Sequence, residues 1–526
     1  MSPVNNKSWI SRRLLMVSAT TVITAGVVNG ATHVTSSTVV SPDAPRLVVG
    51  VFVEGLSPRM LQSIDQLLMP GGISRLVNEG VVIENVDYGN VCGNAVATAM
   101  IMTGTPPRIN GISSTGVYDR DSRRASSVVS DPGVMGNFTS EAYSPAPLRV
   151  STLADELRVS TSGHGRVYSI SADAPTAILA GGHAANNAVW INDSDGKWAS
   201  STYYKELPEP VKTCNYKSPL SARIDTITWS GQGFRYTFPR RDANRYEAFK
   251  VSPRANDEVV SLACDYLQYM SRGRSAATPS TDMLTIGLNV GEYPYGNVAS
   301  ALASEQRDAH MRLDRQIARL LSSIDATYGL DNTLVFIAST PPVHLSRPVA
   351  GEWRLPTGDF SPRKAHALLN MYLMALYGNG EWVTGYHDFS FYLNNQLAHE
   401  KGLDLAEFHR QAAILLRRMS GIVDAIAVED AVMPTSPLRD YIDMATAGDV
   451  FIDVAPGWRM VESEDASAGK MIYAAATSTP AYILYKSLPH KIITEPVKAA
   501  AITAALAGCI DIRAPNGASS PAVSLK

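Results

Sequence analysis

The chain has 526 residues, of which 45% are hydrophobic and 18% charged, so it can bury a substantial core within one large domain or two intertwined ones. Its formal net charge of −3 offers no basic field that would displace counterions from a nucleic acid. Nucleic acid is therefore excluded as a main partner.

The first 30 residues have the pattern of an export signal. Lys7, Arg12 and Arg13 precede an apolar run over 14–28, and small residues at 28–30 offer a cleavage point. Ordinary secretion, a twin-arginine route and an uncleaved anchor are all compatible with this pattern, although the run is short and threonine-rich for a membrane span. We expect residues 31–45 to form a linker. The mature protein should be periplasmic or otherwise exported, with no membrane span after signal cleavage.

A buried strand and a helix come next in the chain. Residues 47–53 form a short apolar run rich in valine, which is typical of a strand covered on both faces of a parallel sheet. Glu54 follows at the carboxyl end, where doubly wound α/β proteins place their ligands. Ser57 and Pro58 then supply a helix N-cap and a proline at the first helical position.

Strand and helix signals alternate through the rest of the chain. Strands are predicted over 165–171, 283–289 and 333–338, and an apolar stripe at helical spacing over 313–324 predicts a helix between the last two strands. This order favours a right-handed crossover and a mostly parallel sheet. A last helix is predicted from Pro496 to Ala507, ended by Gly508.

Two regions interrupt this alternation. Residues 192–275 are polar with scattered aromatic side chains, which could form either a recognition surface or a small core of their own. Residues 350–460 contain a separate helix and strand. We expect both to be α+β cap insertions. The α/β core then consists of 46–191, 276–349 and 461–526.

The chain has four cysteines, at Cys92, Cys214, Cys264 and Cys509. Export would permit disulfides, and four cysteines allow three pairings, none of which the spacing selects. Cys264 and Cys509 lie in helical patterns and could equally be core thiols. The pairing stays open.

Several segments, in their order along the chain, resemble the alkaline phosphatase superfamily, specifically exported bacterial phosphomonoesterases related to nucleotide pyrophosphatase/phosphodiesterases. These segments are the first strand with Glu54, then 102–112, 180–186, 196–204, 389–397 with 400–403, and 514–517. Together they span nearly all of the mature chain. The resemblance implies a three-layer α/β sandwich with a mostly parallel central sheet and an inserted α+β cap.

Members of that superfamily are known for two zinc ions, held by aspartates and histidines, and for a threonine or serine nucleophile between them. Two metals can clamp the attacking and leaving oxygens of an in-line displacement. Carried over by motif, the nucleophile position falls on Asn94, which has no hydroxyl. The phosphate-contacting positions fall on Thr115, Asp173 and Pro175, which we interpret as a vestigial phosphate site.

The metal-binding positions differ in the same direction. The aspartate after the first strand is Glu54, which could still coordinate, and an Asp–His pair becomes Glu292 and Gly296. An Asp-His-Gly triplet becomes the sequence 340–342, Thr-Pro-Pro, and the last histidine is replaced within 484–486. The residual candidates Glu54, Glu292 and His344 could hold magnesium or calcium weakly.

Each of these residues also has a purely structural interpretation. Glu54 is either a former ligand or a cap of the next helical turn, and Asn94 either completes a small anion site or is a capping amide. Cys92 could act as a nucleophile, although no base is evident beside it. Glu292 and His344 could be ordinary loop residues.

The sequence therefore predicts an exported pseudophosphatase that serves as a binding or assembly module. An active metal-dependent phosphomonoesterase, or a phosphodiesterase/nucleotide pyrophosphatase with diverged ligands, is the alternative. No cofactor is expected for the first function, and a divalent metal, zinc, for the second. The expected partner is an unknown protein or a small anionic ligand.

Overall fold

The computed structural model describes residues 44–89, 93–204, 206–272, 280–290, 299–341, 358–455, 458–461, 470–471 and 479–526. The predicted signal and most of the predicted linker lie outside these residues. Within them, no helix has both the length and the apolarity needed to cross a membrane.

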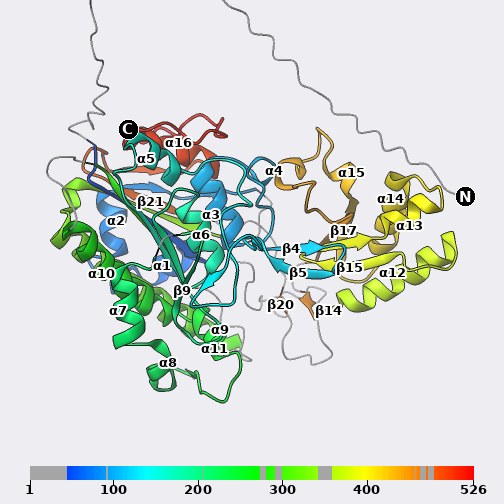
Figure 1. Cartoon of the computed structure of the whole chain (residues 1–526), viewed down its shortest axis with the longest axis horizontal. Coiled ribbons are helices and arrows are strands. Elements are labelled where there is room, and N and C mark those ends of the chain that lie inside the picture. Colours follow the sequence, from blue (N-terminus) through cyan, green and yellow to red (C-terminus); the bar gives the residue numbers. More distant parts are fainter. Residues whose placement is uncertain are drawn as a thin grey trace, which may run out of the picture. The chain divides into compact units, whose positions relative to one another are not determined.

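A ten-stranded sheet forms the centre of the fold (Figure 1). Its order is β22-β2-β21-β13-β1-β12-β7-β8-β9-β6. The five strands from β13 to β8 are mutually parallel, and antiparallel pairs flank them. The bounds are β1 Leu47–Glu54, β2 Val81–Ile83, β6 Gly136–Asn137, β7 Val167–Ser171, β8 Asn187–Ile191, β9 Trp198–Ser201, β12 Asp282–Asn289, β13 Thr333–Thr340, β21 Ala481–Leu484 and β22 Lys491–Ile493. The predicted mostly parallel α/β sheet is confirmed.

Strand β1 shows why the sheet is covered on both sides. Val49, Val51 and Val53 pack into one hydrophobic cluster, whereas Val48 and Phe52 pack into another. Successive side chains of a strand point to opposite faces, so an unbroken apolar run requires two covering layers. This arrangement makes the core a three-layer α/β sandwich.

Each face is covered by its own helices. The first layer contains α1 Pro58–Ser63, α2 Ile73–Glu79, α7 Glu209–Lys217, α8 Leu220–Arg223, α9 Arg245–Lys250, α10 Ala255–Arg272 and α11 Ala299–Thr327. The second contains α3 Asn94–Thr103, α5 Leu153–Ser160, α6 Ala174–Gly181 and α16 Ala499–Cys509. The predicted helix over 313–324 is the second half of α11, and Ser57 caps α1 by accepting a hydrogen bond from Met60 N.

The last helix differs from its prediction at both ends. It begins at Ala499 because Val497 and Lys498 form strand β23, which pairs with β3 (Val86–Asp87). Gly508 lies inside the helix, which continues to Cys509. A glycine near a helix end can belong to the last helical turn as well as follow it, because helix boundaries vary by one or two residues.

The described residues of the predicted insertion 192–275 contribute to the main core. Trp198, Trp229 and Tyr246 are almost fully buried in the first-layer cluster, and β9 pairs within the central sheet. Core packing is therefore the role of most aromatics in this region. Beside them, β10 (Thr228–Gly231) and β11 (Phe234–Thr237) form a two-stranded hairpin.

Residues 358–455 form a separate hydrophobic cluster, and we call this segment the cap. Its antiparallel sheet has the order β15-β16-β18-β17, and α12 and α14 pack against it. The bounds are β14 Asp359–Phe360, α12 Pro362–Tyr377, β15 Val383–His387, β16 Ser390–Leu393, α13 Asn395–Glu400, α14 Leu405–Leu416, β17 Ile422–Ala427, α15 Val428–Ala431 and β18 Val450–Val454. The predicted helix from 405 and strand over 450–454 are both present.

A hairpin of the core reaches the cap. It consists of β4 (Gly116–Asp119) and β5 (Arg124–Ser127). Tyr118 donates a hydrogen bond from its hydroxyl to Thr384 O over 2.8 Å, and its ring lies 4.3 Å from that of Tyr392, centroid to centroid. The loop that leads into β4 is therefore held against the cap sheet.

Candidate functional site: a neutral cluster and a seam cavity

The carboxyl ends of the central parallel strands lie side by side. Glu54 at the end of β1 is in register with Thr340 at the end of β13 and with Asn289 at the end of β12. Gly55 N donates to Thr340 O over 3.1 Å, which continues this pairing beyond the strands. This edge is where an open α/β sheet binds its ligands.

Helix α3 begins at this edge with Asn94. Gly93 precedes it at a φ of 98°, a left-handed conformation that glycine adopts without a steric penalty. Asn94 is 8% exposed, so its amide needs hydrogen-bond partners inside the protein. Asn94 is the first residue of α3, and it is buried because α3 packs closely against the sheet.

Two threonines supply those partners. Asn94 Nδ2 donates to Thr176 Oγ1 over 2.8 Å, and Asn94 Oδ1 accepts from Thr340 Oγ1 over 2.7 Å. A longer bond of 3.4 Å comes from Thr98 Oγ1. Thr176, Thr340 and Thr98 are fully buried. We call Asn94 and these three threonines the neutral cluster. The Asn94 side chain links β13, α3 and α6, and it does not cap the backbone of α3.

The three residues of the predicted phosphate site lie in different surroundings. Asp173 is the N-cap of α6: its Oδ2 accepts from Thr176 N over 2.9 Å, and its Oδ1 accepts from Ser171 Oγ over 2.8 Å. Pro175 is in the first turn of the same helix, where its missing N–H costs nothing. Thr115 is exposed in the loop before β4. The Asp173 carboxylate is committed to capping and would repel a phosphate.

Packing also closes the space beside β12. A Cβ atom at Gly287 would lie 2.4 Å from Ser171 Oγ and 2.8 Å from Thr176 Cγ2. Tyr88 is buried as well and donates its hydroxyl hydrogen to Ser339 O over 2.8 Å, and burial raises the pKa of this phenol. These contacts leave the neutral cluster tightly enclosed.

These groups do not fit a two-zinc centre. Zinc binds carboxylate oxygen, imidazole nitrogen or thiolate, and neither an amide nor an aliphatic hydroxyl replaces them. In the described ranges, no three or more His, Cys, Asp or Glu side chains converge as a metal-binding group. Glu292, His344 and Cys92 lie outside those ranges, and Glu54 stays a candidate ligand. Cys214, Cys264 and Cys509 are unpaired thiols.

His183 belongs to the scaffold, as its sequence context indicated. Its Nδ1 lies 3.0 Å from Asp155 Oδ2, and its Nε2 lies 3.1 Å from Leu148 O. The hydrogen bond to Asp155 raises the pKa of the imidazole. Asp155 also completes a capping box with Thr152 at the start of α5.

A cavity of about 80 Å³ lies at the seam between the core and the cap. The loop before β4 contributes Ser113 and Ser114 from the core side. The turn between β15 and β16 contributes His387 and Asp388 from the cap side. We call this space the seam cavity. Tyr392, Tyr441, Asp443 and Thr446 are also part of its lining.

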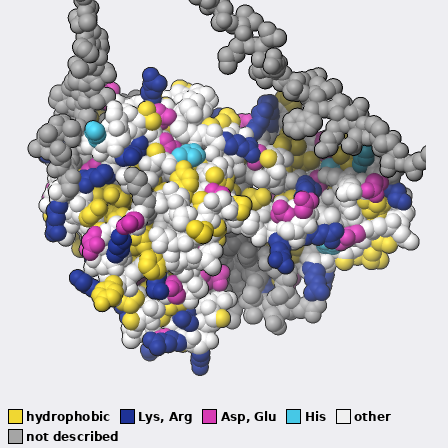
Figure 2. Space-filling model, in the orientation of Figure 1, with side chains coloured by type: hydrophobic (Ala, Val, Ile, Leu, Met, Phe, Trp, Pro, Cys, Tyr) yellow, Lys and Arg dark blue, Asp and Glu magenta, His cyan; other side chains and the backbone are white. Residues whose placement is uncertain are grey.

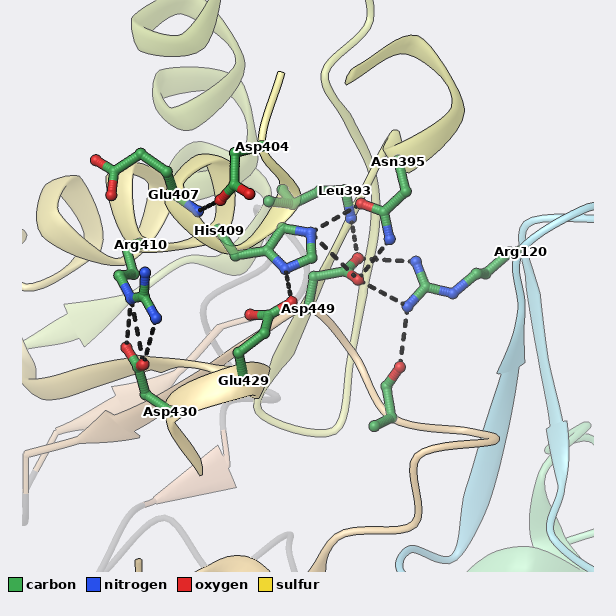
Figure 3. Close-up of polar contacts among 11 residues, drawn as sticks. Arg120, Leu393, Asn395, Asp404, Glu407, His409, Arg410, Glu429, Asp430 and Asp449 are labelled. Carbon is green, nitrogen blue, oxygen red and sulfur yellow. Dashed lines mark hydrogen bonds and ion pairs between the residues drawn. The ribbon is translucent and has the colours of Figure 1, made fainter. Parts of the chain in front are cut away.

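Two bidentate ion pairs brace the walls of the seam cavity. Arg149 donates to both oxygens of Asp443 over 2.8 Å each. Arg120, which follows β4, donates to Asp449 over 2.8 and 3.1 Å and to Ala447 O over 3.0 Å. Figure 3 shows the guanidinium of Arg120 meeting the Asp449 carboxylate. Both aspartates are buried, so these pairs fix the loop from 443 to 449.

Behind Asp449, a polar network extends into the cap (Figure 3). Asn395 Nδ2 and Leu393 N donate to the Asp449 carboxylate over 2.9 and 2.6 Å. His409, 2% exposed, lies between Glu429 Oε1 and Asn395 Oδ1, each 2.9 Å from a ring nitrogen. The network ties α13 and α14 to Asp449, which directly precedes strand β18. It positions the cavity wall.

Sequence reasoning did not find the seam cavity. Its lining comes from three segments far apart in the chain, and no spacing rule joins residues near 113, 388 and 443. One signal was present: His387 and Asp388 stand between two strand-like runs, where a tight turn would present them together.

Comparison with known proteins settles the family. The family model for type I phosphodiesterase / nucleotide pyrophosphatase matches residues 48–341, which is more than half of the chain. The chain belongs to this family. The resemblance to the alkaline phosphatase superfamily is thereby confirmed, and the match includes both β1 and β13, whose ends form the candidate site.

Curated relatives carry phosphatase and transport names. A protein named calcium-transporting ATPase from Myroides odoratus is 27% identical over 455 residues, which cover 79% of this chain and 82% of that protein. Alkaline phosphatase PafA from Elizabethkingia meningoseptica is 26% identical over 73% of this chain and 76% of its own length. Alkaline phosphatase PhoV from Synechococcus elongatus is 26% identical, with 79% and 80% covered.

Solved structures agree on the fold. The crystal structure of wild-type alkaline phosphatase PafA superposes with a TM-score of 0.79 at 22% identity, covering 91% of this chain and 98% of that one. Murine ectonucleotide pyrophosphatase / phosphodiesterase 5 gives a TM-score of 0.51 at 11% identity. At these identities the likeness concerns the fold, including the cap, and not the chemistry.

Proposed function

We propose that this chain is an exported, catalytically inactive member of the type I phosphodiesterase / nucleotide pyrophosphatase family that serves as a binding or assembly module. The observation that carries the proposal is the neutral cluster. The position matched to the nucleophile is Asn94, whose amide oxygen and nitrogen are already bonded to Thr340 and Thr176. An amide offers no oxygen nucleophile for a covalent phosphoryl intermediate.

The charge at this edge supports the proposal. A phosphoryl transfer site gathers cations around the transferring group. Here the matched positions carry Asp173, Pro175 and Thr115, and none of them is a cation. The family's use of metal is compatible with Glu54 as one ligand, but a single carboxylate does not build a bimetallic site.

Export is part of the proposal and rests on the N-terminal pattern of basic residues followed by an apolar run over 14–28. Expressing the full chain in a bacterium with export machinery and sequencing the N-terminus of the mature protein tests it. Cleavage close to residue 30 supports export, whereas an intact N-terminus in the cytosolic fraction contradicts it.

The catalytic part of the proposal is tested by metal content and turnover on the same preparation. We expect purified protein to contain far less than one zinc per chain by elemental mass spectrometry. It should hydrolyse neither 4-nitrophenyl phosphate nor bis(4-nitrophenyl) phosphate above a buffer control, with or without added zinc. Stoichiometric zinc together with turnover would establish the alternative, an active phosphomonoesterase or phosphodiesterase.

That alternative has one specific support, the names of the curated relatives, two of which are alkaline phosphatases at 26% identity. Its ligands would have to include Glu292 or His344. The substitution Glu54→Gln separates the two cases. A working metal site would lose zinc and activity on this substitution, whereas an inactive chain would give the same zinc content and the same background turnover as the parent.

The partner is a protein or a small ligand. A small anion, if bound, would lie between Asn94 and the loop that follows Val53, at the N-terminus of α3. Phosphate titration followed by NMR chemical shifts of the Asn94 side-chain amide tests this placement. Absence of shifts up to high millimolar phosphate removes the anion from the proposal.

A further inference from the structure

The seam cavity has the chemistry of a ligand site of its own. We propose that it binds a small, uncharged polyhydroxy compound, such as a sugar or a cyclic polyol. The inference rests on the proposed function, since it names the ligand class of a binding module. It concerns a different place from the neutral cluster, and its lining residues come from the cap as well as the core.

The charges of the lining disfavour an anion. Asp388 and Asp443 both face the cavity, and no lysine or arginine is among the lining residues that the structure describes. Arg149 approaches from behind and is fully engaged with Asp443. A phosphate would therefore be repelled by the Asp388 carboxylate and find no cation free to pair with it, since Arg149 and Asp443 neutralise each other.

The aromatic surface disfavours a cationic amine. The guanidinium of Arg120 lies over the Tyr392 ring, 4.9 Å from its centroid. The ring face that would otherwise attract an ammonium group is thus already covered by a cation. An ammonium group in the cavity would find that ring face occupied and would gain only the Asp388 carboxylate, because Arg149 already pairs with Asp443.

Hydroxyl groups supply the remaining chemistry. Ser113, Ser114, Tyr441 and Thr446 bring hydroxyls to the lining, and each can both donate and accept a hydrogen bond. The Asp388 carboxylate accepts from Ser114 Oγ, and a carboxylate has further lone pairs for ligand hydroxyls. A polyol matches this mixture because its groups also donate and accept.

The turn that presents Asp388 is strained. Asp388 and Phe389 have φ values of 45° and 62°, the left-handed region that an aromatic residue rarely adopts. The Phe389 side chain packs against the cap core, and Ile452 N donates to Phe389 O over 2.9 Å, which holds the turn in place. Because His387 pairs with Ser390, Asp388 and Phe389 are the two central residues of a tight hairpin turn, which requires positive φ at both and so fixes the place of the Asp388 carboxylate.

One buried atom at the cavity wall lacks a partner. His387 Nε2 is inaccessible to solvent and has no hydrogen-bond partner within the described part of the chain. An unpaired buried atom costs free energy, and because solvent does not reach Nε2, the His387 ring would have to turn before a ligand hydroxyl could bond to it. The cavity of about 80 Å³ has room for several water-sized groups, which suits one edge of a sugar ring.

The test uses the full chain, with saturation-transfer NMR for the probes that carry C–H protons and ³¹P line broadening for inorganic phosphate. Glucose and myo-inositol serve as uncharged polyols, putrescine as an amine and inorganic phosphate as an anion. We expect saturable binding of at least one polyol, with a Kd on the order of 1 mM. Asp388→Asn should weaken that binding about tenfold, since it replaces a charged acceptor and keeps the shape.

A matched control is Asp331→Asn. Asp331 is exposed in the short helix Leu330–Asn332 and does not line the seam cavity. It should bind the polyol as the parent chain does. His387→Gln provides a second variant at the cavity, and thermal unfolding of all three variants confirms that each is folded. A tenfold loss in Asp388→Asn and a loss in His387→Gln, with unchanged melting temperatures and parent-like binding by Asp331→Asn, support the site.

Three outcomes would overturn the assignment. They are pocket-dependent binding of putrescine or phosphate in place of the polyols, equal binding by Asp388→Asn and the parent chain, and no binding of any probe at 50-fold the expected Kd, about 50 mM. Zinc content and phosphate-ester hydrolysis measured on the same samples judge the proposed function separately. A zinc-loaded, active protein would fail that proposal whatever the polyol result.

Discussion

Asn94 stabilises the fold through two hydrogen bonds between uncharged groups. Its amide joins α3 to β13 through Thr340 and to α6 through Thr176. A buried amide is stable when both its oxygen and its nitrogen are hydrogen-bonded. Without Asn94, the hydroxyls of Thr340 and Thr176 would be buried with one partner fewer, which costs free energy of desolvation. The residue at the matched nucleophile position is therefore a structural element of the present chain.

We predict that Asn94→Ala lowers the free energy of unfolding by about 3 kcal/mol, because two buried hydroxyls lose their partner and a small cavity forms. Urea denaturation followed by circular dichroism measures the change. Asn78→Ala, at an exposed position of α2, serves as control and should alter stability by less than about 0.5 kcal/mol. Equal effects of the two substitutions would contradict this role of Asn94.

His310 predicts how stability depends on pH. The side chain is 2% exposed, its Nδ1 lies 2.7 Å from Gln306 O, and its Nε2 accepts from Ser57 N over 3.1 Å. Burial lowers the pKa of this imidazole from 6.5 to about 4. Between these values the unfolded chain binds a proton that the folded chain does not, so stability falls as pH falls from 6.5 towards 4.

The complete loss across that window is about 3 kcal/mol from this residue. Urea midpoints measured at pH 7 and pH 4.5 should show it. In His310→Asn the unfolded chain no longer takes up this proton, so the difference between the two pH values should shrink by about the same amount. An unchanged difference in the variant would assign the pH dependence to other groups.

At the scale of elements, the β4–β5 hairpin forms polar connections from the core to the cap. Arg120 pairs with Asp449, which is only 4% exposed, while Arg123 pairs with Glu381 at the surface over 2.6 and 2.8 Å. The two pairs have similar geometry and different burial. Burial should decide which of them matters, because an exposed pair is screened by water.

We predict that Arg120→Ala destabilises the cap by about 2 kcal/mol, since it leaves the Asp449 carboxylate with less compensation. Hydrogen exchange of β16 and β18 amides should report this as faster opening. Arg123→Ala is the matched control, and we expect a change below about 0.5 kcal/mol. Faster exchange in the control and not in Arg120→Ala would refute the difference between buried and exposed pairs.

At the scale of the whole molecule, most of the central sheet could be predicted from the sequence. The valine-rich run at 47–53 and the apolar runs near 283 and 333 were enough to predict a parallel sheet, because burial on both faces needs unbroken apolar strands. The start of the last helix was missed because β23 forms only when Val497 finds Val86, a pairing between residues far apart in the chain.

The candidate site was predictable only in part. Motif order placed Asn94, Asp173 and the end of β13 at one edge, but the hydrogen bonds that make them a neutral cluster depend on how α3 and α6 pack. The seam cavity depends on tertiary placement altogether. Figure 2 shows basic and acidic side chains interspersed over one face, in keeping with the small net charge.

For the whole protein we predict indifference to metal removal. Thermal unfolding with EDTA and with added zinc should give the same melting temperature, since a metal bound only by the folded state would raise it. Manganese and calcium additions extend the same measurement to the ions that carboxylates prefer. A clear upward shift with any one ion would contradict this prediction and show that the folded chain binds that metal.

The four residues of the neutral cluster also bear on how such a site could change over time. Converting Thr340 alone to aspartate would place a lone negative charge among hydroxyls and an amide, at a cost of several kcal/mol. If the proposed function is correct, converting Asn94 alone to threonine would add a hydroxyl without a metal to activate it. Under that proposal each single replacement is either less stable or without benefit, so several replacements would be needed together to gain catalysis.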